Sequence, residues 1–345
     1  MKLFSNDLGV DLGTANVLIY VDGQGVIVRE PSVVAVDKNT GKLLEVGAAA
    51  RNMLGRTPGN VVAMHPLKDG VISDHGMTVR MLQVLFREAS KASLLTPKPR
   101  VVICVPSGVT EVEERTVINA AIEAGARRVY LIEEPLAAAL GANLDISGPN
   151  GHMIVDIGGG TTDVAVLTLN AVAASSSIKV AGNSFDEAIG RYVRRRHGVV
   201  IGQTTAEDIK IKIGRVHETA EDATMTIKGR DVKSGMPKEL VLSSSEIAEV
   251  LRRPARQIAD EVLSVLENTS PELVSDISEN GITLTGGGSQ LTGMAQLLTD
   301  RTGIKCTLSD DPCACVAYGC GKSLGWINRM QEGPINIAKR RLMRG

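Results

Sequence analysis

The amino-acid sequence predicts an α/β protein of two related domains, each built on a mixed sheet flanked by helices. Residues 8–21 read LGVDLGTANVLIYV and residues 153–169 read MIVDIGGGTTDVAVLTL, so each has an apolar strand, an acid, a glycine-containing turn and a second apolar strand. A unit that recurs within one chain indicates related halves. The continuous apolar run at residues 101–105, between two helical patterns, indicates a parallel sheet with both faces covered.

The turn of each hairpin is suited to a phosphate group. Glycine has no Cβ, so the backbone N–H groups of Gly158, Gly159 and Gly160 can approach a ligand closely. Asp156 would repel an anion directly, and its place at the mouth of the turn therefore indicates a hydrated divalent cation. A plain glycine-rich hairpin is the alternative for this stretch alone. Because Asp11 begins the same phrase in the first hairpin, we expect a ligand that is gripped from both sides.

Composition limits the class of protein. The 345 residues suffice for two domains, and with 43% hydrophobic but 2% aromatic residues their cores must consist of Val, Ile, Leu, Ala and Met. The net charge of −1 gives no electrostatic reason to expect nucleic acid. No apolar run has the length of a membrane span and no signal-peptide h-region is present, so we expect the chain in the cytosol. The five cysteines include no C-x-x-C pair, which indicates reduced, buried thiols rather than a zinc site or disulfides.

The first half predicts a small α+β insertion, followed by helices that alternate with strands. Strands at residues 25–36 and 43–46 flank a turn at residues 37–41. A loop at residues 66–74 ends in the N-cap candidate Asp74. The helix that follows turns an apolar face inward, made of Met77, Met81, Leu82, Leu85 and Phe86.

A capping box of Thr110 and Glu113 predicts the start of the next helix, which runs to Gly125. The residues expected on its inward face are Val117, Ile118, Ala121 and Ile122. After a strand at residues 129–132, an alanine-rich helix is expected at residues 136–143. Its low bulk permits close packing at a crossover between the domains.

In the second half, Ser184 is the expected N-cap of a helix that ends at Gly198. The arginines of this helix are Arg191, Arg194, Arg195 and Arg196. They suit a solvated face and the negative end of the helix dipole better than nucleic-acid binding. A short helix at residues 205–214 follows, and then strands at residues 225–227 and 239–242.

The last third of the chain predicts a third close approach of backbone to ligand. Ser245 is the expected cap of a long helix whose apolar residues keep helical spacing through Pro254. Residues 281–291 read as a strand that runs into three glycines and the start of a helix, whose N-terminal amides can face a ligand. A final helix is expected at residues 311–324.

Eight short motifs, read in order, resemble the MreB family of bacterial actin homologues, which includes the paralogue Mbl. They are DLGTAN at 11–16, EPSVVA at 30–35, RTPGN at 56–60, PLKDGVI at 66–72, EEPLAAA at 133–139, DIGGGTTD at 156–163, TAEDIK at 205–210 and LTGGG at 284–288. The resemblance covers nearly the whole chain. It implies the actin-like ATPase fold, with four subdomains around a nucleotide cleft.

The resemblance also implies domain boundaries. Domain I would comprise residues 1–140, with a subdomain IB insertion at about 31–64, and would be completed by residues 315–345. Domain II would comprise residues 141–314, with subdomain IIB at about 179–244.

ATP and Mg²⁺ are the cofactors that the resemblance implies. The residues it assigns to nucleotide binding are Thr14, Ala15, Asn16, Gly158, Gly159, Gly160, Thr161, Glu207, Asp208, Ile209, Lys210, Gly286, Gly287, Gly288 and Ser289. Asp11 and Asp156 would organise the metal and its waters, and Glu134 would orient or deprotonate the attacking water with help from Thr161. The alternative for either acid of the Glu133–Glu134 pair is a charge at a helix entry, and for Glu133 we favour it.

The implied function is a cytoskeletal ATPase that polymerises into filaments, with paired protofilaments and slow hydrolysis regulating the polymer. Its implied partners are further copies of itself, the inner face of the cytoplasmic membrane and membrane proteins of the cell-wall elongation machinery, and its role is to help determine cell shape. Leu3, Phe4, Leu94 and Leu95 are the expected membrane contacts of this cytoplasmic, peripherally attached protein. Packing of Leu94 and Leu95 on the preceding helix is the alternative.

Three other classes of ATP-using protein fit less well. A small-molecule kinase needs an acceptor pocket with a catalytic aspartate, which we do not identify. A chaperone ATPase carries a long C-terminal substrate-binding region, whereas only about twenty residues follow Leu324. Residues 321–323 read Gly-Lys-Ser like the end of a P-loop, but Val316 stands where its first glycine is required.

Overall fold

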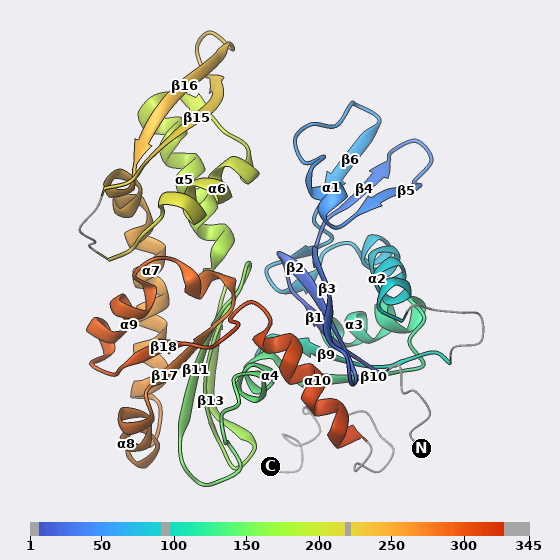
Figure 1. Cartoon of the computed structure of the whole chain (residues 1–345), viewed down its shortest axis with the longest axis vertical. Helices are drawn as coiled ribbons and strands as arrows, with labels where there is room; N and C mark the ends of the chain where they lie inside the picture. Colours follow the sequence, from blue (N-terminus) through green and yellow to red (C-terminus); the bar gives the residue numbers. More distant parts are fainter. Residues whose placement is uncertain (1–6, 91–96, 218–221, 328–345) are drawn as a thin grey trace.

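The structure, a computed structural model, describes residues 7–90, 97–217 and 222–327 (Figure 1). Two five-stranded sheets form its two halves, in the orders β10-β9-β1-β2-β3 and β13-β12-β11-β17-β18. Each sheet has a central strand that pairs antiparallel with the next strand of a meander and parallel with a strand from later in the chain. The two sheets therefore have the same topology, which confirms the prediction of two related halves.

The first sheet is covered on both faces. Its strands are β1 (Leu8–Leu12), β2 (Asn16–Val21), β3 (Gly25–Pro31), β9 (Arg100–Val105) and β10 (Arg128–Glu133). On β9, Val101 and Ile103 belong to a core shared with α2 (His75–Ser90) and α3 (Glu111–Glu123), whereas Val102 and Cys104 belong to a core shared with α4 (Glu134–Gly141) and α10 (Cys315–Ile327). This alternation follows from the two-residue period of a strand.

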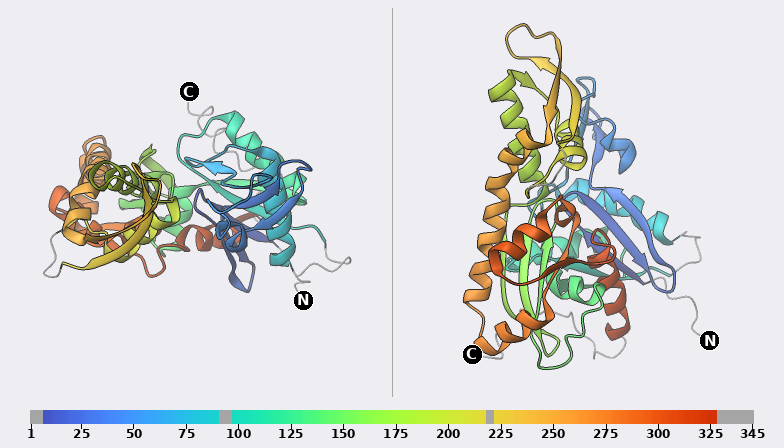
Figure 2. Two further views of the ribbon diagram at one scale, coloured as in Figure 1. Left: turned by 90° about the horizontal axis from the view of Figure 1, so that it is seen from above. Right: turned by 60° about the vertical axis from the view of Figure 1, so that its left-hand side comes forward.

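The second sheet has the corresponding arrangement. Its strands are β11 (His152–Ile157), β12 (Thr162–Thr168), β13 (Ala171–Ile178), β17 (Ile282–Thr285) and β18 (Cys306–Leu308). The long helix α7 (Ser244–Glu267) and the helices α8 (Pro271–Asn280) and α9 (Met294–Thr302) lie on the side away from the other half (Figures 1 and 2). Buried aliphatic side chains of β11, β12, β17 and α7 share one core.

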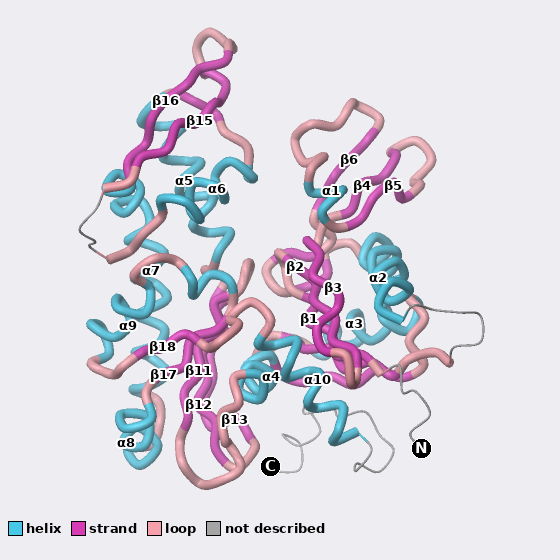
Figure 3. Tube along the Cα trace, in the orientation of Figure 1, coloured by secondary structure: helices cyan, strands magenta, loops and turns pink. Residues whose placement is uncertain are grey.

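Each half carries a small sheet at the same end of the molecule (Figure 3). The first contains β4 (Val34–Asp37), β5 (Leu43–Val46) and β6 (Val61–Met64) with the short helix α1 (Ala48–Arg51). The second contains β14 (Val199–Val200), β15 (Thr224–Asp231) and β16 (Pro237–Ser243), beside α5 (Gly182–His197) and α6 (Gln203–Ile213). A two-stranded hairpin of β7 (Leu67–Lys68) and β8 (Val71–Ile72) follows the first small sheet in the chain.

Helices α4 and α10 lie between the halves and pack against each other (Figure 1). The packing is backbone to backbone: a Cβ built on Gly141 would lie 1.8 Å from the carbonyl oxygen of Cys315, and one built on Gly319 would lie 1.7 Å from that of Ala137. The core around them takes buried side chains from both sheets, including Val102 and Ile154. The expected close-packed crossover between the halves is confirmed.

Several helix starts differ from the sequence prediction. α5 begins at Gly182 after the N-cap Ala181, so Ser184 is the third helical residue, and its Oγ accepts a hydrogen bond from the Ala181 N–H at 3.3 Å. The cap of α7 is Ser243, whose Oγ accepts from the Glu246 N–H at 3.2 Å, and not Ser245. At α7 three consecutive serines stand at the start, so spacing alone does not single out the cap, whereas at α5 the helix begins two residues before its nearest serine.

Other differences concern faces and ends. Ile122 is 48% exposed, while Ala120 fills the inward position on α3. Residues 25–36 form two strands, β3 and β4, because they pair in different sheets. The glycines after β17 enter a short 3-10 turn, η1 (Gly287–Gln290), and α9 starts only at Met294. The last helix begins at Cys315 rather than at residue 311.

The remaining expectations about the chain's edges have separate outcomes. Among the described residues, no helix combines the length and the apolar character needed to cross a membrane. Leu3, Phe4, Leu94 and Leu95 lie outside the described residues. The domain boundaries at residues 140 and 315 stay predictions.

Candidate functional site

The turns of the two repeated hairpins meet face to face. A Cβ on Gly159 would lie 2.6 Å from the Cβ of Ala15, and a Cβ on Gly160 would lie 2.6 Å from the Oγ1 of Thr14. Glycine at both positions is therefore required for the loops to touch. The contact brings the β1–β2 and β11–β12 turns to opposite walls of one pocket, as the repeated phrase predicts.

Hydrogen bonds from neighbouring segments hold both loops in place. Thr14 is 7% exposed, and its Oγ1 accepts a hydrogen bond from the Gly70 N–H, at the tip of the β7–β8 hairpin, at 2.9 Å. The N–H groups of Gly182 and Asn183 donate to the carbonyl oxygens of Gly158 and Gly159 at 3.0 and 2.8 Å. The start of α5 thus holds the second loop, and both loops are preformed.

The third glycine run closes the pocket at the end of β17. Gly286 has φ of 81°, and a Cβ there would lie 2.3 Å from the Oδ1 of Asp156. A Cβ on Gly288 would lie 2.6 Å from the side chain of Ile157. The backbone of this turn therefore approaches β11 closely and leaves its outer face to the pocket, which Gly286, Gly287 and Gly288 line.

Carboxyl groups form the floor of the pocket. Asp11 comes from β1, Asp156 from β11 and Glu134 from the first turn of α4. Burial raises the pKa of Asp11 to about 7, against a small opposing effect of the Cys104 thiol. Burial, then the charges of Asp163, Asp156 and Asp11, raise the pKa of Glu134 well above its usual range. The floor thus gathers carboxyl groups whose ionised forms are disfavoured by burial and by their mutual repulsion.

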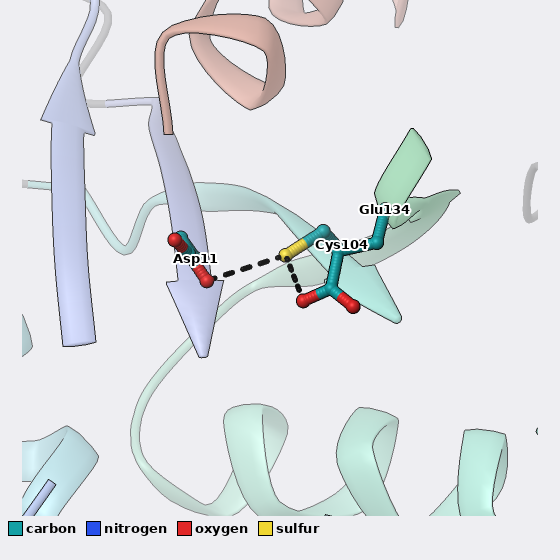
Figure 4. Close-up of side chains that lie close together, drawn as sticks. All are labelled: Asp11, Cys104 and Glu134. Carbon is teal, nitrogen blue, oxygen red and sulfur yellow. Dashed lines mark hydrogen bonds between the residues drawn. The ribbon is translucent and has the colours of Figure 1, made fainter. Parts of the chain in front are cut away.

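Cys104 was not predicted at this site; it does not line the pocket but contacts two carboxyl groups of the floor. Its Sγ lies 3.7 Å from the Oδ1 of Asp11 and 4.0 Å from the Oε1 of Glu134, between the two carboxyl groups (Figure 4). The apolar pattern of β9 predicts only that this cysteine is buried. Nothing in the local sequence shows that β1 and α4 pack beside it.

Asp163 was also missed. It is buried and accepts a hydrogen bond from the Ser107 N–H at 2.9 Å. Burial raises its pKa to about 6.

Helix α6 supplies the wall opposite the first small sheet. The guanidinium of Arg51 on α1 forms an ion pair with Glu207, and this contact joins the two small sheets across the pocket mouth. Lys210 lies 2.9 Å from Asp186 and donates to the Gly182 carbonyl oxygen at 3.1 Å. Burial raises the pKa of Asp186 to about 6, and the Lys210 charge opposes this rise.

The pocket has a volume of about 630 Å³, within the range of a small-molecule site. The predicted residues that line it are Asp11, Thr14, Ala15, Asn16, Glu134, Asp156, Gly158, Gly159, Gly160, Thr161, Glu207, Lys210, Gly286, Gly287 and Gly288. Asp208, Ile209 and Ser289 do not line it. Ile209 is fully buried in the second core because it lies on the opposite face of α6, and the Ser289 Oγ donates to the Gly286 carbonyl oxygen at 2.6 Å.

Sequence reasoning missed part of the lining. Ile211 lines the pocket and is 68% exposed, and its position four residues after Glu207 on one helix face is a signal that could have identified it. Arg29 and the segment at residues 290–292 also line the pocket. No local pattern identifies these residues as pocket lining, because Arg29 reaches the pocket from the edge strand β3 and residues 290–292 reach it from the turn after η1.

The pocket fits a nucleotide with a divalent cation. The glycine turns line the pocket and present backbone to it, and their lack of Cβ atoms lets the surrounding segments pack closely behind them. The Oδ1 of Asp156 and the Oε2 of Glu134 are buried and have no hydrogen-bond partner among the described residues. Buried carboxylate oxygens without partners are costly, and a hydrated cation at the floor would satisfy them.

Comparisons with known proteins agree with this geometry. The family described as "MreB/Mbl protein" matches residues 5–332. The chain is 49% identical to the cell shape-determining protein MreB of Escherichia coli K12 over 330 residues, which cover 94% of this chain and 95% of that protein. It is 46% identical to the cell shape-determining protein Mbl of Bacillus subtilis 168 over 334 residues, which cover 97% of this chain and all of that protein.

Solved structures show the same fold. The crystal structure of MreB5 of Spiroplasma citri bound to ADP superposes with a TM-score of 0.89 at 42% identity, covering 93% of this chain and 97% of that one. The MamK double helical filament superposes with a TM-score of 0.77 at 22% identity, covering 94% and 99% of the two chains, and supports the fold alone. With actin-like neighbours of this kind and a family match over nearly its whole length, the chain belongs to the MreB/Mbl family of bacterial actin homologues.

Proposed function

We propose that this protein is an ATP-binding actin homologue that polymerises into membrane-associated filaments and helps to determine cell shape by organising cell-wall synthesis. The observation that carries the proposal is the pocket in which two glycine turns from related halves touch above buried carboxyl groups. The likeness to proteins named cell shape-determining, over 94% of the chain, supports the cellular role. The nucleotide-bound MreB5 structures, one with ADP and one with AMPPNP, support the ligand.

In this proposal each part of ATP faces one wall of the pocket. The turns at residues 13–16 and 158–161 offer backbone N–H groups to the phosphates, and Gly286 to Gly288 offer a flat surface to the base. Glu207 and Lys210 border the ribose side, and Ile211 extends the apolar surface beside the base.

Asp11 and Asp156 would hold Mg²⁺ through its waters at the pocket floor. Bound Mg²⁺ supplies positive charge that offsets both the phosphate oxygens and the neighbouring carboxylates. Glu134 then orients the attacking water from the rigid first turn of α4, with Thr161 beside it. Positioning and charge neutralisation, rather than covalent chemistry, provide the rate enhancement.

Glu134→Ala tests the chemical assignment. We expect phosphate release from assembled protein to fall by about 10²-fold or more, the scale of a positioned general base, with little change in ATP affinity. Glu133→Ala is the matched control, because that neighbouring carboxyl does not line the pocket. Equal phosphate release by wild type and Glu134→Ala contradicts the assignment. A matched loss of ATP binding makes Glu134 a structural residue.

Assembly and membrane attachment are tested separately. We expect ATP and Mg²⁺ to favour filaments, with paired protofilaments, in pelleting assays and electron micrographs. Protein that stays monomeric with ATP across salt and lipid conditions refutes this.

Leu94 and Leu95, with Leu3 and Phe4, would contribute roughly 1.5–3 kcal/mol each if inserted into the membrane, and a filament repeats this weak anchor. Liposome co-sedimentation of Leu94→Ser with Leu95→Ser should therefore drop, and unchanged lipid binding would place this loop in the core instead.

A further inference from the structure

The thiol of Cys104 occupies an unusual position for a core cysteine. It lies between two carboxyl groups, and the three ligand atoms from Asp11, Cys104 and Glu134 all lie within 4.8 Å of one another (Figure 4). They come from three elements, β1, β9 and α4, which the fold brings together at the pocket floor. No C-x-x-C spacing announces this arrangement, and the fold alone creates it.

The separations match those of ligands around one small cation. With metal–sulfur and metal–oxygen bonds of about 2.3 and 2.1 Å, neighbouring sulfur and oxygen ligands lie roughly 3.5–3.8 Å apart. The observed distances from the Cys104 Sγ are 3.7 Å to Asp11 and 4.0 Å to Glu134. A metal at the centre would shorten the two sulfur–oxygen distances by only a few tenths of an ångström, and the two carboxylate oxygens already lie within 4.8 Å of each other.

Two unpartnered oxygens show that the polar groups here are not already satisfied. The Oε2 of Glu134 is buried without a hydrogen-bond partner. Asp156, which is 6% exposed and lines the same pocket, has an unpartnered Oδ1. A charge-neutralising ligand at the floor would compensate groups that are otherwise left costly.

We propose that Asp11, Cys104 and Glu134 form a site for a soft divalent cation such as Zn²⁺, Cd²⁺ or Co²⁺, distinct in ligand type from the Mg²⁺ position. Thiolate ligands select such metals, whereas Mg²⁺ takes oxygen ligands. As the sulfur–metal bond forms, the Sγ proton leaves to solvent. Asp11 and Glu134 both line the pocket, so a fourth coordination position faces it and takes a water or a phosphate oxygen.

The site has a consequence for the ATPase, and this part rests on the proposed function. A soft cation would engage Asp11, which the Mg²⁺ position requires, and Glu134, which orients the water. It would therefore inhibit hydrolysis without displacing the glycine turns that hold the nucleotide. Cys104 is then the residue that makes the enzyme sensitive to thiophilic metals.

Cobalt titration of the full-length, nucleotide-free protein tests the site without any need for ATPase activity. We expect about one Co²⁺ per chain and a near-ultraviolet thiolate-to-cobalt charge-transfer band, which millimolar Mg²⁺ does not remove. Cys104→Ser should lose the band and bind Zn²⁺ at least 10-fold more weakly, the scale on which ligand environment acts. Cys306→Ser is the matched control, because it removes a buried thiol of the second core and should keep the band.

Absence of the band in wild type, or its persistence in Cys104→Ser, overturns the proposal. Glu134→Gln supplies a second variant should Cys104→Ser fold poorly: it keeps the thiol, and unchanged Zn²⁺ affinity in this variant also overturns the site. In phosphate-release assays, micromolar Zn²⁺ should inhibit wild type and Cys306→Ser but spare Cys104→Ser. A cobalt band in a protein that shows no ATPase activity would support the metal site while contradicting the proposed function.

Discussion

Substitution of Gly319 by alanine tests how the two halves are joined. A Cβ at Gly319 would lie 1.7 Å from the carbonyl oxygen of Ala137, whereas ordinary contact begins at 3.4 Å. Both partners belong to helix backbones, so no side-chain rotation can relieve the clash. The two helices would have to separate by roughly the 1.7 Å difference (3.4 − 1.7), which opens the tightest contact between α4 and α10.

Two effects of opposite sign determine the magnitude. Alanine in place of glycine within a helix stabilises it by up to about 1 kcal/mol. Overpacking in a close-packed region costs about 1–3 kcal/mol, and separation of α4 from α10 also weakens contacts of the surrounding core. Gly325→Ala on the same helix isolates the first effect, because no described atom outside its own stretch of helix lies within 4 Å of the added methyl. We therefore expect Gly319→Ala to be at least about 2 kcal/mol less stable than Gly325→Ala.

Urea unfolding of nucleotide-free protein, followed by circular dichroism, measures this difference through the transition midpoints and slopes. Because α4 begins at Glu134, the same displacement should slow phosphate release in Gly319→Ala but not in Gly325→Ala. Coincident unfolding curves for the two variants would falsify the view that backbone contact between these helices holds the halves together.

Three further predictions follow from the site. Arg51→Ala removes the half-exposed ion pair with Glu207 across the pocket mouth. Such a pair contributes up to about 1 kcal/mol, so nucleotide should dissociate at most roughly 5-fold faster. A larger change in a fluorescent-nucleotide chase would mean that the pair has another role. Burial raises the pKa of Asp11 from 3.8 to about 7 and that of Asp163 from 3.8 to about 6, so the folded state binds more protons than the unfolded chain. The stability that these two groups contribute is fully present below pH 3.8 and is lost as pH rises to the folded-state pKa values. The loss is up to about 1.4 kcal/mol per pH unit for each group. Thermal unfolding of nucleotide-free protein should show this decline, and Asp163→Asn should flatten it; an unchanged slope refutes the assignment. Gly286→Ala should abolish ATP binding. Gly303→Ala should bind ATP normally, because it has a similar positive φ but no described atom near its added methyl. Equal binding by the two variants would show that the close approach at Gly286 is not required.

The sequence predicted the parts of the site that depend on local pattern. The repeated Asp–glycine phrase identifies both turns, because a hairpin that must present backbone to a ligand needs glycine at defined positions. The capping box at Thr110 and Glu113 is also confirmed, since both of its hydrogen bonds form within four residues. Turns and helix caps can therefore be predicted from a short stretch of sequence, because the contacts that form them lie within that stretch.

Features that depend on distant contacts were not predictable in the same way. Cys104 looks like any buried residue of an apolar strand, and its place between two carboxyl groups arises only when β1 and α4 pack beside β9. Glu207 was assigned to the nucleotide, but no pattern indicated that Arg51, from the other half, would pair with it. Ile209 was misplaced because a run of consecutive residues was assigned to the pocket, whereas a helix turns only every third or fourth residue to one side.

Two of the contacts between the halves differ in their energetics, and this difference bears on how the pocket works. At the base, α4 and α10 meet through glycine backbones within a core that takes side chains from both sheets. At the mouth, the pair of Arg51 and Glu207 is half-exposed, and such a pair contributes about 0–1 kcal/mol. The mouth can therefore open at small energetic expense while the base stays packed.

Since each phosphate turn belongs to a different half, a nucleotide that bridges them adds contacts only when the mouth is closed. Its binding energy thus favours the closed arrangement, and loss of the terminal phosphate removes part of that bias. The small sheets at the mouth would move most, so any subunit contact made through them would depend on the nucleotide, which is the coupling a polymerising ATPase requires.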